Sequence, residues 1–244
     1  MTALVSTFDY ARQPKVAVDK CNCCGSPHGM CVAVGDRYGF EARLFKCQSC
    51  GLKYLNPRMT KSTYYEFYRE HYRALVNSYQ GHETTIEQLT KSQAQYSRML
   101  IAQLGDIETH GRLIDVGGST GVVAKAFADQ YGCDPTVLDP APDELAVAED
   151  LGCKTIRGMA EDLKGKWDVV LMLQTVEHLT DIARVFDKIR ATGGLFIWDF
   201  VESQIKIDHP YMLCDKAADE YLRRAGFELE RRIKWGKYTL HVCR

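Results

Sequence analysis

The chain of 244 residues is long enough for one substantial hydrophobic core and a small accessory unit. Its 31 Lys and Arg residues nearly balance 32 Asp and Glu residues, which excludes a general electrostatic preference for nucleic acid, membrane surfaces or acidic substrates. The N-terminal residues lack the basic start and apolar run of a signal peptide, and no stretch of eighteen apolar residues follows. We therefore expect a globular cytoplasmic protein that does not bind or span a membrane.

Six of the ten cysteines lie in the first fifth of the chain, and four of them form two C-x-x-C-G motifs. Two thiolates two residues apart can bind one tetrahedral zinc ion from a tight turn, and the glycine that follows permits that turn. The alternating sequence between the motifs, residues 30–46, predicts a short hairpin that joins them. We predict an N-terminal zinc ribbon whose metal ligands are Cys21, Cys24, Cys47 and Cys50.

Four thiolate ligands close the coordination shell of zinc, so this metal should be structural and should not bind substrate. Cys23 stays open as an alternative ligand, because Cys21 and Cys23 could also bind one metal ion. Cys31 is expected in the core. From Lys20 to Arg58, six basic residues stand against two acidic ones, a local balance of +4. This balance fits either an anionic substrate or an ordinary solvated surface.

Two helices are predicted after Pro57, over Thr60–Val76 and Ile86–Leu104, where apolar residues recur at spacings of three and four. The first helix carries a stripe of aromatic residues, which we expect in the core rather than on a substrate platform. We therefore expect a zinc ribbon over residues 1–58, a helical connector or lid over 59–108, and a third domain over 109–244.

Predicted strands and helices alternate from Arg112 to the end of the chain. Such alternation predicts an α/β fold with an open, mostly parallel sheet and helices on both faces. Ligands of these sheets bind at the carboxyl ends of the strands. The first strand, residues 112–117, ends in a glycine-rich loop, which we therefore expect to bind a ligand.

The sequence of this loop excludes two common phosphate sites. A dinucleotide fingerprint that starts at Gly117 would need glycines where the chain has Ser119 and Val122, and the P-loop pattern G-x-x-x-x-G-K is absent. The pattern present is D-x-G-x-x-x-G, formed by Asp115, Gly117 and Gly121. It resembles the first motif, D/E-x-G-x-G-x-G, of the class I S-adenosylmethionine-dependent methyltransferases. Ser119 replaces the middle glycine, which is tolerable if its backbone angles are ordinary.

The resemblance to this family spans roughly residues 110–244 and implies a Rossmann-like sheet with an antiparallel C-terminal strand. Asp139, at the end of the second strand, is then expected to accept the two ribose hydroxyls. The backbone of Ala160, with Glu161 or Asp162, is expected around the adenine. The implied S-adenosylmethionine-binding residues are Asp115, Gly117, Gly118, Ser119, Gly121, Asp139, Pro140, Ala160, Glu161 and Gln174.

The stretches KCQSCGLKYLNPRMT and YEFYREHYR resemble a zinc-ribbon subfamily, similar to sugar methyltransferases and ubiquinone-pathway O-methyltransferases. This resemblance implies methyl transfer to a hydroxyl of a sugar, nucleotide-sugar or surface-polysaccharide precursor. The candidate catalytic bases are His178 and His209, because neutral imidazole titrates near pH 7. Alternatively, Glu177 and His178 cap a helix and His209 packs in a loop. Motifs of amino-directed and cytosine-directed enzymes are absent, so oxygen is the expected acceptor.

Two other functions stay open. An RNA methyltransferase that binds RNA through the ribbon would fit the local balance of +4, but the overall charge balance opposes nucleic acid as a partner. A non-catalytic protein that binds cofactor or a partner would fit Ser119 and Met159, which depart from the family pattern. A small-molecule or carbohydrate substrate is the favoured partner. The sequence does not define the oligomeric state.

Overall fold

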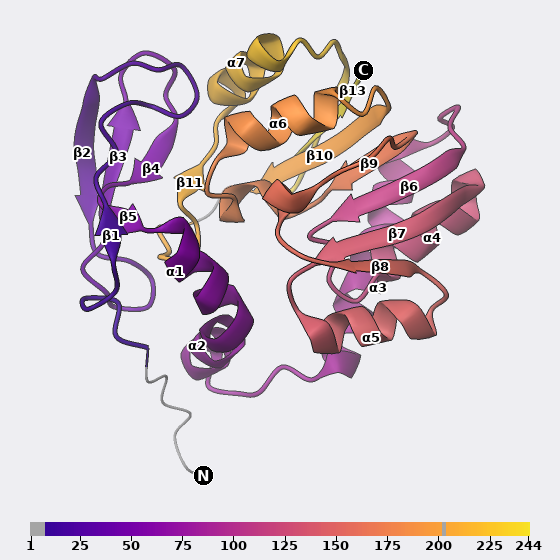
Figure 1. Cartoon of the computed structure of the whole chain (residues 1–244), viewed down its shortest axis with the longest axis horizontal. Coiled ribbons are helices and arrows are strands. Elements are labelled where there is room, and N and C mark those ends of the chain that lie inside the picture. Colours follow the sequence, from indigo (N-terminus) through magenta and orange to yellow (C-terminus); the bar gives the residue numbers. More distant parts are fainter. Residues whose placement is uncertain (1–7, 202–203) are drawn as a thin grey trace. The chain divides into compact units, whose positions relative to one another are not determined.

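The computed structural model describes residues 8–201 and 204–244, which divide into two compact units (Figure 1). The first, named the ribbon unit, takes in Met1–Glu83, Glu177–Ala183 and Val201–Ala225 as far as they are described. The second, named the sheet unit, takes in Thr84–Val176, Arg184–Phe200 and Gly226–Arg244. Residues of the predicted third domain, 109–244, occur in both units. The linear domain boundaries expected from the sequence stay a prediction.

A seven-stranded sheet forms the centre of the sheet unit, with the strand order β12-β13-β10-β9-β6-β7-β8. Neighbouring strands from β8 to β10 pair in parallel, whereas β12 and β13 pair antiparallel. The predicted Rossmann-like, mostly parallel sheet is confirmed. The strands are β6 (Gly111–Val116), β7 (Cys133–Asp139), β8 (Lys154–Arg157), β9 (Val169–Met172), β10 (Leu195–Val201), β12 (Leu229–Trp235) and β13 (Tyr238–Cys243).

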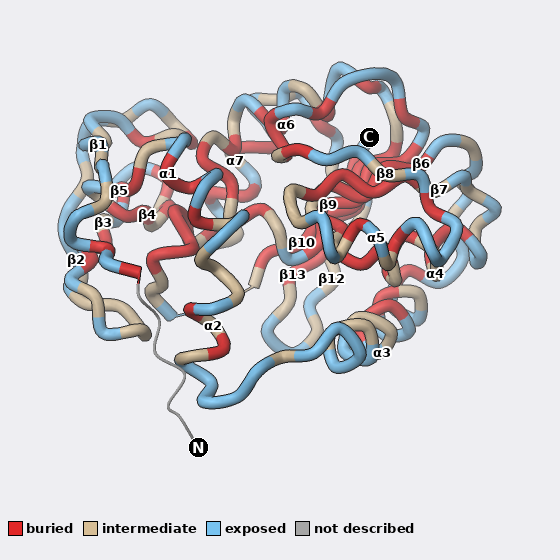
Figure 2. Tube along the Cα trace, turned by 60° about the horizontal axis from the view of Figure 1, so that its bottom comes forward, coloured by how far each residue is buried: buried red, intermediate tan, exposed pale blue. Residues whose placement is uncertain are grey.

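Helices cover both faces of this sheet. Side chains along a strand alternate between the two faces, so neighbouring residues of β10 contact different helices. In β10, Leu195 and Ile197 belong to a buried cluster with residues of α3, α4 and α5. Phe196 and Trp198 instead contact Phe186 of α6, with ring centroids 5.2 and 5.0 Å apart. Figure 2 shows how completely β9 and β10 are buried. The helices are α3 (Ile86–Leu104), α4 (Val122–Tyr131), α5 (Pro142–Asp150) and α6 (Ile182–Arg190).

Helix α3 has the same bounds as the helix predicted over Ile86–Leu104. It begins at a capping box: the Thr85 hydroxyl accepts the N–H of Gln88 at 3.2 Å, and the Gln88 side chain accepts the N–H of Thr85 at 3.0 Å. Its apolar face, which includes Tyr96 and Leu100, packs into the core of the sheet unit. Among the described residues, no helix is both long and apolar enough to cross a membrane.

The ribbon unit contains two small sheets, one ordered β11-β4-β3-β2 and one formed by β1 and β5. The predicted hairpin is confirmed, because β2 and β3 pair antiparallel with Gly29 opposite Cys47. Strand β11 lies far from β4 in sequence, yet Tyr211 pairs with Tyr54. The strands are β1 (Lys15–Val16), β2 (Gly29–Val34), β3 (Arg43–Cys47), β4 (Lys53–Leu55), β5 (Arg58–Met59) and β11 (Tyr211–Met212).

The helix predicted over Thr60–Val76 is a succession of α1 (Lys61–Glu66), the π-helix η1 (Phe67–His71) and α2 (Tyr72–Gln80). Tyr64 and Phe67 are fully buried in the core of the ribbon unit, as expected for the aromatic stripe. Tyr68 instead directs its hydroxyl to polar partners on other segments. A fourth helix of this unit, α7, spans Asp215–Ala225.

Candidate active site

The glycine-rich loop follows β6 and begins α4, and its glycines lie where side chains would not fit. A Cβ added at Gly117 would lie 2.5 Å from the Thr175 hydroxyl oxygen, and Gly117 has a φ of 76°. A Cβ at Gly118 would lie 2.7 Å from the carboxylate of Asp115. At Gly121, with a φ of 73°, it would lie 2.7 Å from a methyl group on α5. The three glycines therefore let the backbone pass close to the ends of neighbouring elements.

Ser119 does not have the ordinary backbone angles under which a serine at this position would be tolerable. Its φ is 51°, in the left-handed region that favours glycine. Two contacts hold it there: its N–H donates to Asp139 Oδ2 at 3.0 Å, and its hydroxyl donates to Glu144. The middle position of the motif thus keeps a glycine-like conformation although the residue is serine.

Asp139 lies at the end of β7, beside this loop. Its Oδ1 accepts the N–H of Ala141 at 2.9 Å, while its Oδ2 accepts the N–H of Ser119. Two backbone bonds tie the ends of adjacent strands together, from Gly117 N–H to the carbonyl of Leu138 at 2.7 Å and from Gly158 N–H to the carbonyl of Asp139 at 3.1 Å. The half-buried Pro140 follows directly. The Asp139 carboxylate is therefore oriented by the backbone at the carboxyl edge of the sheet.

The turns after β8 and β9 carry the remaining predicted cofactor residues. Ala160 and Glu161 are buried in the 3-10 turn η2 (Ala160–Asp162), and Asp162 accepts the N–H of Met159 at 3.0 Å. After β9, the Gln174 side chain is exposed and its φ is 52°. The ten predicted cofactor residues all belong to the sheet unit, at the carboxyl ends of four parallel strands.

Asp199, two residues before the end of β10, is a residue of this edge that the sequence did not point to. Its carboxylate accepts the N–H of Gln174 at 2.5 Å and the hydroxyl of Tyr96 at 2.6 Å, so it fixes the strained turn after β9. Burial raises the pKa of Asp199 to about 6, although both hydrogen bonds oppose this shift. Burial, with the charges of Asp139 and Asp199, raises the pKa of Asp115 to about 7. Two acidic side chains are thus buried beneath the loop.

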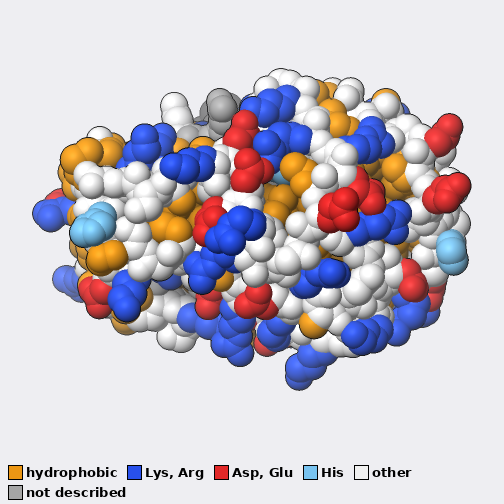
Figure 3. Space-filling model, turned by 90° about the horizontal axis from the view of Figure 1, so that it is seen from above, with side chains coloured by type: hydrophobic (Ala, Val, Ile, Leu, Met, Phe, Trp, Pro, Cys, Tyr) orange, Lys and Arg blue, Asp and Glu red, His pale blue; other side chains and the backbone are white. Residues whose placement is uncertain are grey.

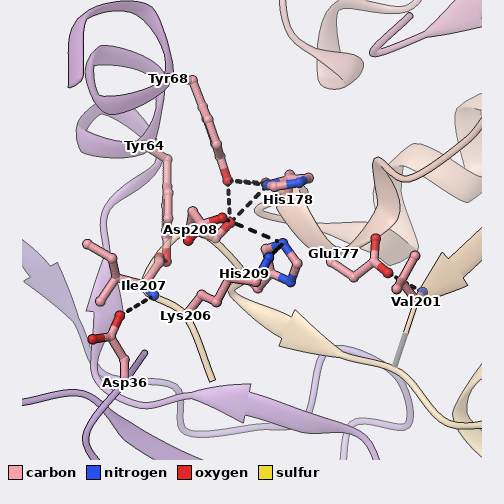
Figure 4. Close-up of polar contacts among 10 residues, drawn as sticks. All are labelled: Asp36, Tyr64, Tyr68, Glu177, His178, Val201, Lys206, Ile207, Asp208 and His209. Atoms are coloured by element: carbon pink, nitrogen blue, oxygen red, sulfur yellow. Dashed lines mark hydrogen bonds and ion pairs between the residues drawn. The ribbon is translucent and has the colours of Figure 1, made fainter. Parts of the chain in front are cut away.

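The two predicted catalytic histidines lie together in the ribbon unit (Figure 4). Their ring centroids are 4.5 Å apart. His178, in the 3-10 turn η3 (Val176–His178), places Nδ1 3.0 Å from the carbonyl oxygen of Asp208, and the hydroxyl of Tyr68 donates to the same oxygen at 2.5 Å. His209 places Nε2 3.0 Å from the ammonium of Lys206. Sequence reasoning brought the two histidines forward separately and did not predict that they meet.

Burial of the two histidines favours neutral rings. Burial lowers the pKa of His178, although the carboxylate of Asp208 opposes this shift. Burial, the His178 ring and the ammonium of Lys206 lower the pKa of His209 well below its usual range. Asp208 is fully buried, and neither carboxylate oxygen has a hydrogen-bond partner among the described residues. The Nε2 atom of His209 lies 3.6 Å from Asp208 Oδ2.

The segment that carries these groups is fixed by the β2–β3 hairpin and by α1. Asp36 accepts the N–H of Ile207 at 3.0 Å, and the hydroxyl of Tyr64 donates to the carbonyl of Ile207 at 3.1 Å (Figure 4). Glu177 accepts the N–H of Val201. The histidine cluster is therefore built by three separate stretches of the ribbon unit.

The four cysteines predicted as metal ligands lie together. Their sulfurs are all within 4.8 Å of one another, and the Cys21–Cys50 and Cys24–Cys47 sulfurs are each 3.5 Å apart. Tetrahedral bonds of about 2.3 Å to zinc would separate the sulfurs by about 3.8 Å, so this cluster could hold a metal ion. In both turns the glycine N–H donates to the first cysteine carbonyl, at 2.8 and 3.0 Å. Among the described residues all cysteines are free thiols.

Two other cysteines of this region do not join the cluster. The thiol of Cys23 donates to the carbonyl of Ala217 on α7 at 3.5 Å, which favours Cys24 rather than Cys23 as the partner of Cys21. Cys31 lies exposed on β2, so our expectation that it belongs to the core was wrong. Strand β2 is an edge strand, and Met30, Cys31 and Val32 are exposed in succession, so both of its faces are open to solvent at this point.

Three of the six basic residues of the ribbon contact aromatic or acidic side chains. Arg37 stacks on Tyr79 at 4.4 Å and Arg58 on Tyr211 at 4.7 Å, while Arg43 pairs with Glu41 at 3.5 Å. On the face of the molecule in Figure 3, Lys and Arg side chains are interspersed with Asp and Glu side chains. This distribution gives no specific support to RNA as a substrate.

The sheet order, the glycine-rich loop and the acidic strand end together define a class I S-adenosylmethionine-dependent methyltransferase domain. Residues 89–231, more than half of the chain, match the sequence model of a family described as "Methyltransferase domain". The chain belongs to this family.

Curated relatives match over shorter stretches. A ubiquinone biosynthesis O-methyltransferase of Bradyrhizobium sp. (strain ORS 278) is 28% identical over 99 residues, which cover 35% of this chain and 38% of that protein. A protein of the same name from Xanthomonas campestris pv. campestris (strain B100) is 25% identical over 153 residues, which cover 57% of this chain and 60% of that protein. The chain thus covers less than two thirds of either relative.

Solved structures share the fold. The mitomycin 7-O-methyltransferase MmcR superposes with a TM-score of 0.57 and 16% identity, over 74% of this chain and 60% of that chain. An S-adenosylmethionine-dependent methyltransferase from Mesorhizobium loti superposes with a TM-score of 0.53 and 16% identity, over 64% of this chain and 99% of that chain. At such identities the likeness establishes the fold alone.

Proposed function

We propose that this protein transfers the methyl group of S-adenosylmethionine to an oxygen of a small polar acceptor. The observation that carries the proposal is the Asp139 carboxylate, held against the glycine-rich loop by the N–H of Ser119 at the carboxyl edge of the sheet. A ligand of this fold binds at that edge, and a carboxylate there can accept two vicinal hydroxyls such as those of a ribose.

The proposed cofactor contacts follow the strand ends. Gly117, Gly118, Ser119 and Gly121 would lie against the methionine part, because their backbone permits close approach. Asp139 and Pro140 would hold the ribose. Ala160 and Glu161 would lie beside the adenine, and the turn at Gln174 would close the site. The buried Asp115 would support the loop from below.

S-adenosylmethionine supplies an activated methyl group on a sulfonium, so the chain must mainly align the acceptor and remove a proton from it. We propose His178 as the base. The carbonyl of Asp208 can only accept, so Nδ1–H of His178 donates to it. The neutral ring therefore carries its proton on Nδ1 and its lone pair on Nε2. Burial lowers the pKa of His178, which keeps that lone pair available near neutral pH.

His209 has a weaker position as a base. Lysine offers donors only, so the contact of Lys206 with His209 Nε2 uses the lone pair of that nitrogen. We propose that His209 orients the acceptor and the Lys206 side chain, and that it accepts a proton less readily than His178.

We propose a hydroxyl of a sugar, nucleotide-sugar or polysaccharide precursor as the acceptor. The names of the curated relatives support oxygen as the methylated atom, and they point to a ubiquinone precursor rather than a sugar for those proteins. The polar surroundings of Asp208, His178 and His209 suit an acceptor with several hydroxyls.

We also propose that Cys21, Cys24, Cys47 and Cys50 hold a structural zinc ion. The clustered sulfurs and the two equivalent turns support this assignment. Four thiolate ligands would leave no position for substrate, so the metal would stabilise the ribbon unit without taking part in methyl transfer.

Radiolabelled methyl transfer tests the proposal. The zinc-loaded protein is incubated with methyl-labelled S-adenosylmethionine and, in separate reactions, with nucleotide-sugars and glycans, with ubiquinone-type phenols and with total RNA. We expect label in the nucleotide-sugar or glycan reaction. Label only in the phenols would support oxygen as the methylated atom but reject a sugar as the acceptor. Label only in RNA would reject a small-molecule acceptor. Absence of S-adenosylmethionine binding would reject the function altogether.

A further inference from the structure

The side chain of Asn22 joins the cysteine turn of the ribbon to the segment that follows His178. Asn22 lies between Cys21 and Cys23, and its Nδ2 donates to Asp181 Oδ1 at 2.8 Å. Its Oδ1 accepts the N–H of Ala183 at 3.3 Å. These bonds bridge about 160 residues of sequence within one compact unit.

The orientation of the Asn22 amide is fixed by its partners. The backbone of Ala183 and the hydroxyl of Tyr221, which lies 2.8 Å from Oδ1, both donate, so the amide oxygen must face them and the NH₂ group must face Asp181. Asn22 uses both lone pairs of its oxygen and one of its two donors. A side chain held in three directions is well suited to fix the atoms that it contacts.

The segment held by Asn22 leads directly from His178 into helix α6. Ala183 is the second residue of α6, and its N–H is one of the first four N–H groups of a helix that lack a partner inside the helix. Asn22 therefore caps this helix from a distant part of the chain. Asp181 lies three residues after His178, and the hydroxyl of Tyr211 fixes the intervening stretch by donating to the carbonyl of Thr180 at 3.0 Å.

We propose that Asn22 is a positioning residue that couples metal binding in the ribbon to the placement of His178. The inference rests on the proposed roles of His178 and of the four cysteines. Two of those cysteines, Cys21 and Cys24, lie within two residues of Asn22, so a bound metal fixes the turn that carries the amide. Loss of the metal frees this turn, releases Asp181 and Ala183, and lets the His178 segment move.

The second cysteine turn provides a matched control. Gln48 occupies the same place after Cys47 that Asn22 occupies after Cys21, and its side chain is exposed. No side-chain bond joins the exposed Gln48 to the segment of residues 177–183 in the described structure. Gln48→Ala should therefore leave both the cysteine turn and the position of His178 unchanged.

Hydrogen exchange with zinc-loaded and EDTA-treated protein tests the coupling without an activity readout. In zinc-loaded Asn22→Ala we expect exchange at residues 178–183 to be about tenfold faster than in the wild type, because hydrogen bonds that hold the segment are lost. Exchange in α2 and the zinc content should stay unchanged, as they should in Gln48→Ala. Chelation of the wild type should speed exchange at 178–183 more than in α2.

A double variant that swaps the two side chains keeps the test decisive if Asn22→Ala folds poorly. Asn22→Asp retains the acceptor for Ala183 but sets two carboxylates against each other, so exchange at 178–183 should rise. The double variant N22D/D181N restores a donor and an acceptor in reversed order, and exchange and kcat should recover together. KM for S-adenosylmethionine should stay constant throughout, because its proposed contacts are in the sheet unit.

Three results would overturn the coupling: unchanged exchange at 178–183 in Asn22→Ala, equal acceleration of α2 and 178–183 on chelation, or no recovery in N22D/D181N. These outcomes are distinct from failure of the proposed function. A protein that transfers no methyl group to any acceptor would reject the role of His178 as a base, while the exchange results would still report on the link between Asn22 and its segment.

Discussion

The backbone N–H of Ser119 donates to the carboxylate of Asp139 at 3.0 Å and thereby joins the glycine-rich loop after β6 to the end of β7. A second bond, from Ala141 N–H to the other oxygen, completes the orientation of this carboxylate. Asp139 thus has two functions in the proposed site. It shapes the loop, and we propose that its remaining lone pairs accept the vicinal hydroxyls of the cofactor.

Replacement of Asp139 by Ala should weaken S-adenosylmethionine binding about tenfold or more, because charged hydrogen-bond acceptors contribute roughly 1.5 to 3 kcal/mol. Isothermal titration calorimetry measures the change. Asp134→Ala is the control, since Asp134 lies on the same strand, is exposed and pairs with Lys154. An unchanged Kd in Asp139→Ala would remove this residue from the cofactor site.

Gly117→Ala and Gly132→Ala should differ although both glycines have left-handed backbones, with φ values of 76° and 73°. A Cβ at Gly132 meets no described atom within 4 Å, so this variant should lose only about 1 kcal/mol of unfolding free energy from backbone strain. Gly117→Ala also clashes with Thr175 and should lose roughly 3 kcal/mol and bind S-adenosylmethionine poorly.

Urea unfolding followed by tryptophan fluorescence measures this difference, because Trp167, Trp198 and Trp235 all belong to the sheet unit. Equal losses for the two variants would show that backbone strain, and not the close approach of Thr175, requires glycine at position 117.

The sheet and its loop could be predicted because their signals are local. The glycines of the loop and the acidic residues at the strand ends lie within short stretches of sequence. The parallel order follows from the alternation of strands and helices. The conformation of Ser119 could not be predicted in this way. Its left-handed φ depends on Asp139 and Glu144, which lie on other elements and hold the residue in place.

The composition of the ribbon unit was hidden from sequence reasoning for the same reason. Nothing near Asp208 or Tyr68 in the sequence reveals that they meet His178, which lies 30 residues from Asp208 and 110 residues from Tyr68. Likewise, the sequence assigns Asn22 no role beyond its place between two cysteines, and only the structure shows its hydrogen bond to Asp181. Contacts between distant segments depend on packing, which residue patterns within one segment do not record.

The buried Asp199 should make the stability of the sheet unit depend on pH. Its pKa is about 6 in the folded protein and about 4 in an unfolded chain, so the folded state binds more protons between these values. The free energy of unfolding contributed by Asp199 therefore falls as pH rises from about 4 to about 6, by up to about 1.4 kcal/mol per pH unit, and is constant above.

Asp199→Asn removes this titration while an amide oxygen can still accept the N–H of Gln174. Relative to the variant, the wild type should lose stability as pH rises through this window, as measured by urea unfolding from pH 4.5 to 7.5 with tryptophan fluorescence. A difference between the two proteins that stays constant with pH would show that Asp199 titrates normally.

Zinc content should distinguish the clustered cysteines from the exposed one. The purified protein should carry about one zinc ion per chain by mass spectrometry of the metal, and Cys47→Ser should bind it far more weakly, because a thiolate ligand is lost. Cys31→Ser should keep full zinc content, since Cys31 lies exposed on β2 outside the cluster. Full zinc content in Cys47→Ser would reject the proposed ligand set.

The pH profile of methyl transfer should identify the base. Burial lowers the pKa of His178, so the ring is neutral near pH 7 and becomes protonated only in more acidic solution. The rate at saturating substrates should therefore rise with pH through this lowered pKa and then stay constant.

His178→Asn should lower kcat by roughly 10² to 10⁴ and remove that acidic limb, while the Kd for S-adenosylmethionine stays the same. His209→Asn should cost less, because Lys206 already occupies its Nε2. A larger loss in His209→Asn, together with a retained acidic limb in His178→Asn, would assign the base to His209.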